Sequence, residues 1–187
     1  MRPVHKTGGR KRSTPESVAA RRELRGQITD RGPVMEAAAV FLAARSRSVD
    51  ETTKRLLHLG YPQPLVEDVV TRLIEMNYLD DEQFARAWVE SRDRARPKGE
   101  LGLRRELALK GVPRDVVDNV MAEREESAAG ENPDLAAARA LLARRNAALS
   151  READFNRRRQ KAYALLARNG FDPETCREAV NAEVRAA

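Results

Sequence analysis

Cysteine and histidine are almost absent from the sequence. Cys176 is the single cysteine among 187 residues, so the chain cannot form an internal disulfide or a cysteine-rich zinc site. It lies on the apolar face of a predicted helix without a histidine nearby in sequence, which indicates a buried structural thiol. His5 and His58 lie far apart in sequence and form no metal-binding cluster. We therefore expect no metal or other cofactor, and a reducing cytoplasm is the simplest location.

Long apolar runs and aromatic residues are also scarce. No run of about 18 apolar residues is present, so we expect no contact with a membrane, and no apolar segment follows the basic N-terminus to make it a secretory signal. Aromatic residues make up 4% of the chain, whereas hydrophobic residues make up 41%. The core must therefore consist mostly of Leu, Val and Ala. Together with a charged fraction of 34%, this composition favours helices over sheets.

The sequence contains no recognisable catalytic pattern. The glycines at residues 8–9, and the pair Gly99 and Gly102, lack the spacing and the preceding strand of a phosphate-binding loop. The acidic residues 80–82 could suggest metal ligands, but their place at the start of a predicted helix explains them as a cap and as charges that complement the helix dipole. We therefore predict that the protein is not an enzyme.

The positive charge is concentrated at the N-terminus. Residues 1–31 hold nine basic and three acidic side chains, a difference that equals the net charge of +6 of the whole chain. The segment contains several Gly, Pro, Ser and Thr residues and has no sustained apolar period. We therefore predict a basic, disordered tail over residues 1–31, and the sequence is compatible with a short helix near residues 16–25 within it.

After the tail, the sequence predicts nine consecutive helices and no strand. Capping residues or prolines mark the helix starts, and glycines mark several of the ends. Three of these ends share one pattern: Leu stands four residues before a helix-ending glycine, an apolar residue follows the glycine, and a new helix starts at once. The three glycines are Gly60, Gly111 and Gly170.

This pattern predicts an internal repeat. We expect an all-α fold of three tandem three-helix repeats, and units that contact only their neighbours form an elongated, curved array. The three predicted units span residues 32–77, 78–127 and 131–187.

A capped helix stands at the centre of the sequence. Asp80 is predicted to cap it, and Asp81 adds negative charge at the positive end of its dipole. Phe84 and Trp88 lie one turn apart on the face that also carries Ala and Val. We interpret these two aromatic residues as part of the core rather than as a pair that stacks on nucleic-acid bases.

Two clusters of basic residues are candidates for binding a partner. The first lies at the join between two predicted helices and comprises Arg92, Arg94, Arg96, Lys98, Arg104 and Arg105. The second comprises Arg157, Arg158 and Arg159, together with Lys161. Neighbouring acidic residues can pair with some of these cations, but three like charges in a row leave at least one without a local partner. A phosphate backbone or an acidic protein surface would serve as the partner, and charge alone does not choose between them.

The central motif resembles that of the RecX family, whose members regulate the bacterial recombinase RecA. The family motif is a Leu-Asp-Asp turn, then Phe-Ala, an aromatic-Val pair, and spaced arginines that end in Gly. The corresponding residues here are Leu79-Asp80-Asp81, Phe84-Ala85, Trp88-Val89, Arg92, Arg96 and Gly99. Lys110-Gly111-Val112 and Gly170-Phe171 also fit. Asn77, Glu100 and Gly102 depart from the family's usual glycine, proline and basic residue.

The resemblance implies a non-enzymatic regulator. Such a protein would bind the RecA–DNA filament along its helical groove and inhibit the ATPase, strand-exchange and co-protease activities of RecA in recombination and the SOS response. The RecA filament is the implied partner, single- or double-stranded DNA stays open as a second one, and a monomer is expected. The alternative is a general nucleic-acid-binding protein that acts through the basic tail and the arginine clusters. A generic helical adaptor is a third hypothesis, because helical arrays serve many partners.

Overall fold

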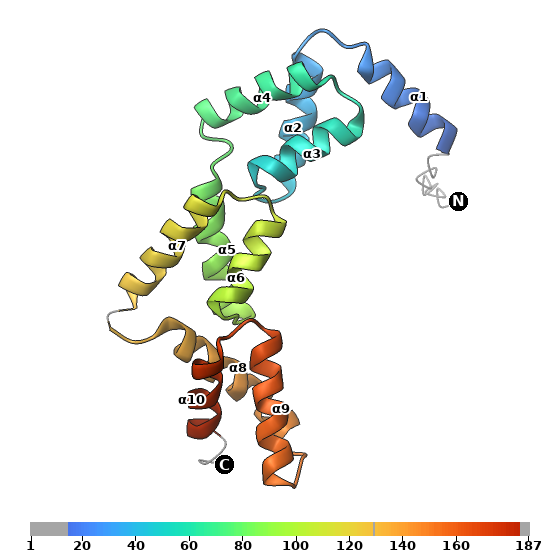
Figure 1. Ribbon diagram of the computed structural model, residues 1–187. Coiled ribbons are helices and arrows are strands. Elements are labelled where there is room, and N and C mark those ends of the chain that lie inside the picture. The colour runs from blue at the N-terminus through green and yellow to red at the C-terminus, as the bar shows by residue number, and fades with distance from the viewer. Residues whose placement is uncertain (1–14, 129, 184–187) are drawn as a thin grey trace, which may run out of the picture.

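The computed structural model describes residues 15–128 and 130–183. Within these residues the chain forms ten helices and no strand, and the helices follow a bent, elongated path (Figure 1). This confirms the predicted all-α array. The helices are α1 (Pro15–Gly26), α2 (Gly32–Ala44), α3 (Val49–Leu59), α4 (Gln63–Glu75), α5 (Asp81–Ala95), α6 (Glu100–Leu109), α7 (Arg114–Ser127), α8 (Pro133–Leu149), α9 (Phe155–Arg168) and α10 (Pro173–Glu183).

From α2 onward the helices pack in threes, each group around its own hydrophobic cluster. The clusters belong to α2–α4, α5–α7 and α8–α10. The leucines of the repeat pattern, Leu56, Leu107 and Leu166, are each fully buried, one in each cluster. Leu79, which the sequence places at the start of the second unit, packs into the cluster of the first. Each group thus has its own core, and Leu79 links the second unit to the core of the first.

Glycine is required at the repeat turns because of the backbone conformation there. Gly60, Gly111 and Gly170 have φ values of 98°, 71° and 82°, in the left-handed region that other residues rarely adopt. In the described part of the chain, Asn77 is the one residue other than glycine with a positive φ, at 57°. The RecX family usually has glycine at this position. Asparagine tolerates this region better than most residues, so the departure keeps the turn.

Part of the basic tail is helical. Helix α1 falls where the sequence allows a short helix, and its Arg22 packs against Gly60 so closely that a side chain on this glycine would overlap it. Arg25 donates a hydrogen bond to the carbonyl of Leu59 at 3.3 Å, and its guanidinium lies 5.5 Å from the ring centroid of Tyr61. Residues 1–14 of the predicted disordered tail lie outside the described residues.

Successive repeats contact each other through the same elements. The N-terminus of α3 packs against the α6–α7 turn, where the Ser48 hydroxyl donates a hydrogen bond to the carbonyl of Lys110 at 2.5 Å. The N-terminus of α6 packs against the α9–α10 turn, where the Gly99 N–H donates to the carbonyl of Asn169 at 3.2 Å. The second helix of one repeat thus always meets the glycine turn of the next.

The same contacts bring the glycines so close to the neighbouring repeat that a side chain would not fit there. A Cβ atom on Gly111 would overlap Asp50 at the start of α3, and one on Gly170 would overlap the backbone of Gly102 in α6. A Cβ on Gly102 would in turn overlap the backbone of the α9–α10 turn. This close approach explains a glycine inside a helix, where glycine is otherwise unfavourable. The departure at Gly102 therefore serves packing.

Each junction also contains a carboxylate that caps the helix of the preceding repeat. Asp81, in the first turn of α5, accepts a hydrogen bond from the N–H of Val49 in α3 at 2.9 Å. Asp134, in the first turn of α8, accepts one from the N–H of Glu100 in α6 at 2.8 Å. Burial raises the pKa of both carboxyl groups. Asp81, interpreted from the sequence as a charge on its own helix, is therefore also a cap for another; Asp80 caps α5 as predicted.

We expect Gly170→Ala to lower the free energy of unfolding by more than the control Gly130→Ala. Both glycines have positive φ, at 82° and 90°, where a Cβ atom costs about 1 to 2 kcal/mol. Only at Gly170 would the new atom also collide with α6, since no described atom lies within 4 Å of a Cβ on Gly130. Urea unfolding of the two variants measures the difference. Equal losses would contradict the role of the close approach.

Candidate functional site

A groove between the second and third repeats gathers cationic side chains from both. It has a volume of about 650 Å³ and is bounded by α5, the α5–α6 loop, α6, α8 and the end of α9. Leu141 and Leu165 contribute its apolar part, and Glu106 is the one carboxylate among the lining residues. The cationic lining residues are Arg92, Arg96, Lys98, Arg144 and Arg145. This excess of positive charge makes the groove the candidate site.

Glu106 holds one side of the groove in place. Its carboxylate accepts hydrogen bonds from Trp88 Nε1 at 2.9 Å and Arg92 Nε at 2.6 Å, and it pairs with Lys98 Nζ at 3.0 Å. The Arg92 guanidinium also lies 4.3 Å from the centroid of the Trp88 ring. Burial raises the pKa of Glu106, but the bonds from Arg92, Lys98 and Trp88 outweigh it, and the pKa is lowered overall. Arg92 and Lys98 are thus already paired within the protein.

The other side of the groove comes from α8. Arg144 donates from Nη1 to the carbonyl of Ala95 at 2.6 Å and from Nη2 to the carbonyl of Arg94 at 2.7 Å. These carbonyls belong to the last turn of α5, where backbone acceptors are free and a cation is favourable. Arg96 and Arg145 are exposed, and their side chains make no hydrogen bond or ion pair with the described residues. These two cations are the ones available to a partner.

The remaining residues of the first predicted cluster do not line the groove. Arg94 is exposed and pairs within its own helix. Arg104 is held by Glu100 at 2.6 Å and by Asp118 of α7. Arg105 is exposed and has no ion pair with the described residues. The structure therefore brings together Arg92, Arg96 and Lys98 but not the other three.

The second predicted cluster lies near the start of α9, and none of its arginines is among the groove's lining residues. Arg158 donates from Nε to the carbonyl of Glu152 at 3.2 Å. Arg159 donates to Asn181 Oδ1 of α10 at 2.7 Å, and Arg157 is exposed. The cluster is therefore a separate basic surface at the end of the array.

Arg144 and Arg145 are site residues that the sequence reasoning does not single out. They follow Leu141 by three and four residues, so they extend the face of α8 that Leu141 presents to the groove. This spacing was the available signal. It becomes informative only once α8 is known to lie beside the end of α5.

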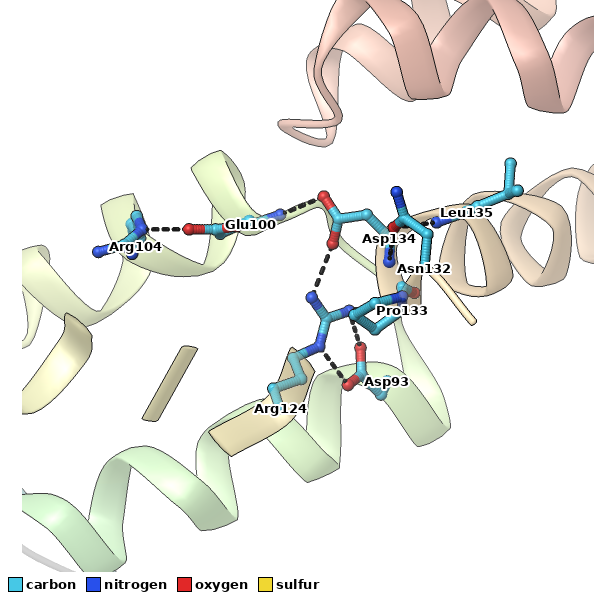
Figure 2. A network of polar contacts seen from close by, with 8 residues as sticks. All are labelled: Asp93, Glu100, Arg104, Arg124, Asn132, Pro133, Asp134 and Leu135. Carbon is cyan, nitrogen blue, oxygen red and sulfur yellow. Dashed lines mark hydrogen bonds and ion pairs between the residues drawn. The ribbon is translucent and has the colours of Figure 1, made fainter. Parts of the chain in front are cut away.

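A buried polar network fixes the two repeats that form the groove (Figure 2). Arg124 of α7 donates from Nε to Asp93 of α5 at 2.9 Å and from Nη1 to Asp134 of α8 at 2.7 Å. The other Asp134 oxygen accepts the Glu100 N–H of α6. Burial lowers the pKa of Arg124, but its bonds to the two carboxylates raise it overall, so the guanidinium stays charged. One side chain thus ties three helices from two repeats.

Two further observations concern other kinds of site. In the described parts of the chain, no group of three or more His, Cys, Asp or Glu side chains could hold a metal ion, and no helix there is long and apolar enough to cross a bilayer. As expected, Cys176 is fully buried, and burial raises the pKa of its thiol, which disfavours the reactive thiolate.

Two family models match the part of the chain that forms the groove. One is described as the second three-helix domain of RecX and matches residues 80–121; the other is described as the third and matches residues 132–180. The regulatory protein RecX of Prosthecochloris aestuarii is 32% identical over 157 residues, which cover 82% of this chain and 95% of that protein. The chain belongs to the RecX family. The groove therefore lies between its second and third RecX domains.

Other RecX proteins agree with this assignment. The regulatory protein RecX of a Mycobacterium species is 34% identical over 146 residues, 77% of this chain and 78% of that protein. The crystal structure of RecX from Lactobacillus salivarius has a TM-score of 0.69 at 15% identity and covers 84% of this chain and 97% of its own. The latter likeness shows a shared fold, and the resemblance seen in the sequence is confirmed.

We expect Asp134→Ala to lower the free energy of unfolding by about 3 kcal/mol, because it leaves the buried Arg124 guanidinium and the Glu100 N–H without an acceptor. The control is Glu75→Ala, which breaks the exposed pair with Arg72 and should cost less than about 1 kcal/mol. Chemical denaturation measures both. Similar small losses in the two variants would contradict a structural role for the network.

We expect the effect of Glu106→Gln on stability to depend on pH. The folded-state pKa of Glu106 lies below the ordinary value of a glutamate, so the carboxylate contributes stability above that ordinary pKa and loses it as the pH falls through the folded-state pKa. The difference in free energy of unfolding between wild type and variant should be largest near about pH 7 and should shrink toward about pH 3. A difference that stays constant over this range would contradict the ionised role.

Proposed function

We propose that this chain is a non-enzymatic regulator that binds the RecA–DNA filament along its helical groove and inhibits the ATPase, strand-exchange and co-protease activities of RecA. Membership of a family whose curated relatives are regulatory proteins supports the regulatory role. The single observation that carries the proposal is the basic groove between the second and third domains, with two exposed arginines at its sides that have no partner among the described residues.

The arrangement of the arginines suits an extended anionic partner. Arg96 comes from the second domain and Arg145 from the third, so one partner surface can contact both domains at once. The planar guanidinium group binds carboxylate and phosphate groups through paired hydrogen bonds. Either acidic side chains of the filament protein or phosphates of its DNA would satisfy this chemistry.

The elongated form supports binding along a filament rather than at one point. Three domains in series present several modest contacts over a long surface (Figure 1). Contacts that are linked in one chain add through a high effective concentration, so none of them needs to be strong. A regulator of this form would bridge more than one filament subunit.

A second candidate function is general nucleic-acid binding. The observation that favours it is the composition of residues 1–14, which hold five basic side chains and no acidic one. Such a segment binds phosphate backbones in a sequence-independent and strongly salt-dependent manner. In that case the groove would add to the affinity but would not determine the partner.

We expect the double variant Arg96→Glu and Arg145→Glu to need at least about tenfold more protein to inhibit RecA ATP hydrolysis on single-stranded DNA. The thermal midpoint should be kept, because neither side chain has a partner among the described residues. Arg92 is unsuitable for this test, since its reversal would also disrupt Glu106. The matched control is Arg31→Glu with Arg114→Glu, two exposed residues outside this groove. Unchanged inhibition by the groove variant would refute the proposal.

Removing residues 1–14 separates the two functions when inhibition of RecA and DNA binding without RecA are both measured. This truncation keeps α1, whose contacts with the first domain a longer deletion would remove. If the chain acts on the RecA filament, inhibition should largely survive. If it is a general nucleic-acid-binding protein, DNA affinity without RecA should fall and its salt dependence should flatten.

A further inference from the structure

The first domain lies at the opposite end of the array from the third (Figure 1), and its side chains line a second groove. It has a volume of about 510 Å³ and lies between α2, the end of α3 and α1. Its apolar lining residues are Pro33, Ala37, Val40, Phe41, Ala44 and Leu59. Val40 is 70% exposed, and because it lies beside the other apolar lining residues it belongs to a contiguous apolar patch.

The apolar residues of this groove follow the period of a helix. The α2 residues recur every three to four positions and form one stripe over about three turns, or roughly 16 Å. Ala37 and Ala44 are small and leave room between the larger Val40 and Phe41. This length and spacing match the side chains that a helix presents at positions i, i+4 and i+7 when it binds in a groove.

Cations surround this apolar stripe. Arg25 and Arg55 line the groove, and the Arg55 guanidinium lies 5.9 Å from the centroid of the Phe41 ring. The Arg47 guanidinium lies 4.1 Å from the same centroid. Its Nε atom is buried and makes no hydrogen bond with the described residues. Glu36 is the one carboxylate among the lining residues, so the rim is positive and one guanidinium keeps an unused donor.

We propose that this groove binds an amphipathic helix of a protein partner, with apolar side chains on one face and carboxylates beside them. The apolar side chains of that helix would pack on the apolar stripe, and its carboxylates would pair with Arg25, Arg47 and Arg55. A nucleic-acid strand would offer phosphates to the cations but no aliphatic side chains to cover the exposed apolar stripe. The N-terminal residues 1–14 are basic and would be repelled by the same rim.

This surface goes beyond the proposed function. It lies in a different domain from the basic groove, shares no lining residue with it, and differs in chemistry because its floor is apolar. A partner with both an acidic surface and an acidic amphipathic helix would contact the array at both grooves. Two such contacts would strengthen each other through effective concentration.

The test uses three synthetic helical peptides of about 14 residues with fluorescent labels. One carries a leucine stripe flanked by glutamates, the second replaces the leucines by glutamines, and the third replaces the glutamates by lysines. Binding to the full chain is measured by fluorescence anisotropy, and the contacted residues are mapped by amide chemical shifts. We expect the leucine–glutamate peptide to bind and to perturb α2 and the end of α3, and the other two to bind at least about tenfold more weakly.

Two variants locate the binding. Val40→Glu places a charge in the apolar stripe at an exposed position and should weaken the leucine–glutamate peptide by about tenfold or more. The control variant Arg96→Glu with Arg145→Glu alters only the basic groove and should leave this binding unchanged. Equal binding of the glutamine peptide, or loss of binding in the control but not in Val40→Glu, would overturn the proposal. So would an oligothymidine that binds in place of the peptide and is sensitive to Val40→Glu.

Discussion

The array depends on one contact that is made twice: the N-terminus of the second helix of a repeat packs against the glycine turn of the next repeat. A helix N-terminus leaves backbone N–H groups without acceptors, and burying them unpaired would be costly. At each junction the following repeat supplies the missing carboxylate, Asp81 for the N–H of Val49 and Asp134 for that of Glu100. The same surface also brings Gly111 against the Asp50 side chain and Gly170 against the backbone of Gly102, so the cap and the close approach together fix the orientation of neighbouring repeats.

The ends of the array close this series in two different ways. At the first repeat, α1 covers Gly60, and the first turn of α2 contains no acidic residue that could cap another helix. At the last repeat, the N-terminus of α9 is capped by its own Asp154, which accepts the N–H of Arg157 at 2.7 Å. Neither end therefore offers the parts of a junction. Repeat arrays need such altered ends, because an open repeat surface would otherwise stay exposed.

Local features of the fold could be predicted from the sequence, and features that depend on the junctions could not. Helix starts such as Asp80 and the turn glycines follow from the conformational preferences of single residues, so they were readable without partners. The capping of Val49 by Asp81 joins residues 32 positions apart, and the pairing of Arg144 with the end of α5 joins residues 49 and 50 apart. For the same reason, the departure at Gly102 could not be explained from the sequence, because the backbone that packs against it belongs to the α9–α10 turn.

The arginines fall into two groups: some are paired with carboxylates and stabilise the fold, and others are exposed and available to a partner. Arg124 is buried between Asp93 and Asp134, and Arg92 is fixed by Glu106 and the ring of Trp88, so both stabilise the packing. Arg96 and Arg145 have no such partner among the described residues and remain exposed. Local charge density cannot distinguish Arg92 from Arg96 and Arg145, because all three lie in basic stretches of the sequence. What distinguishes them is whether the fold brings a carboxylate within reach: Glu106 of the same repeat for Arg92, and both Asp93 of the same repeat and Asp134 of the next for Arg124. The packing that builds the array therefore also decides which cations a partner can bind.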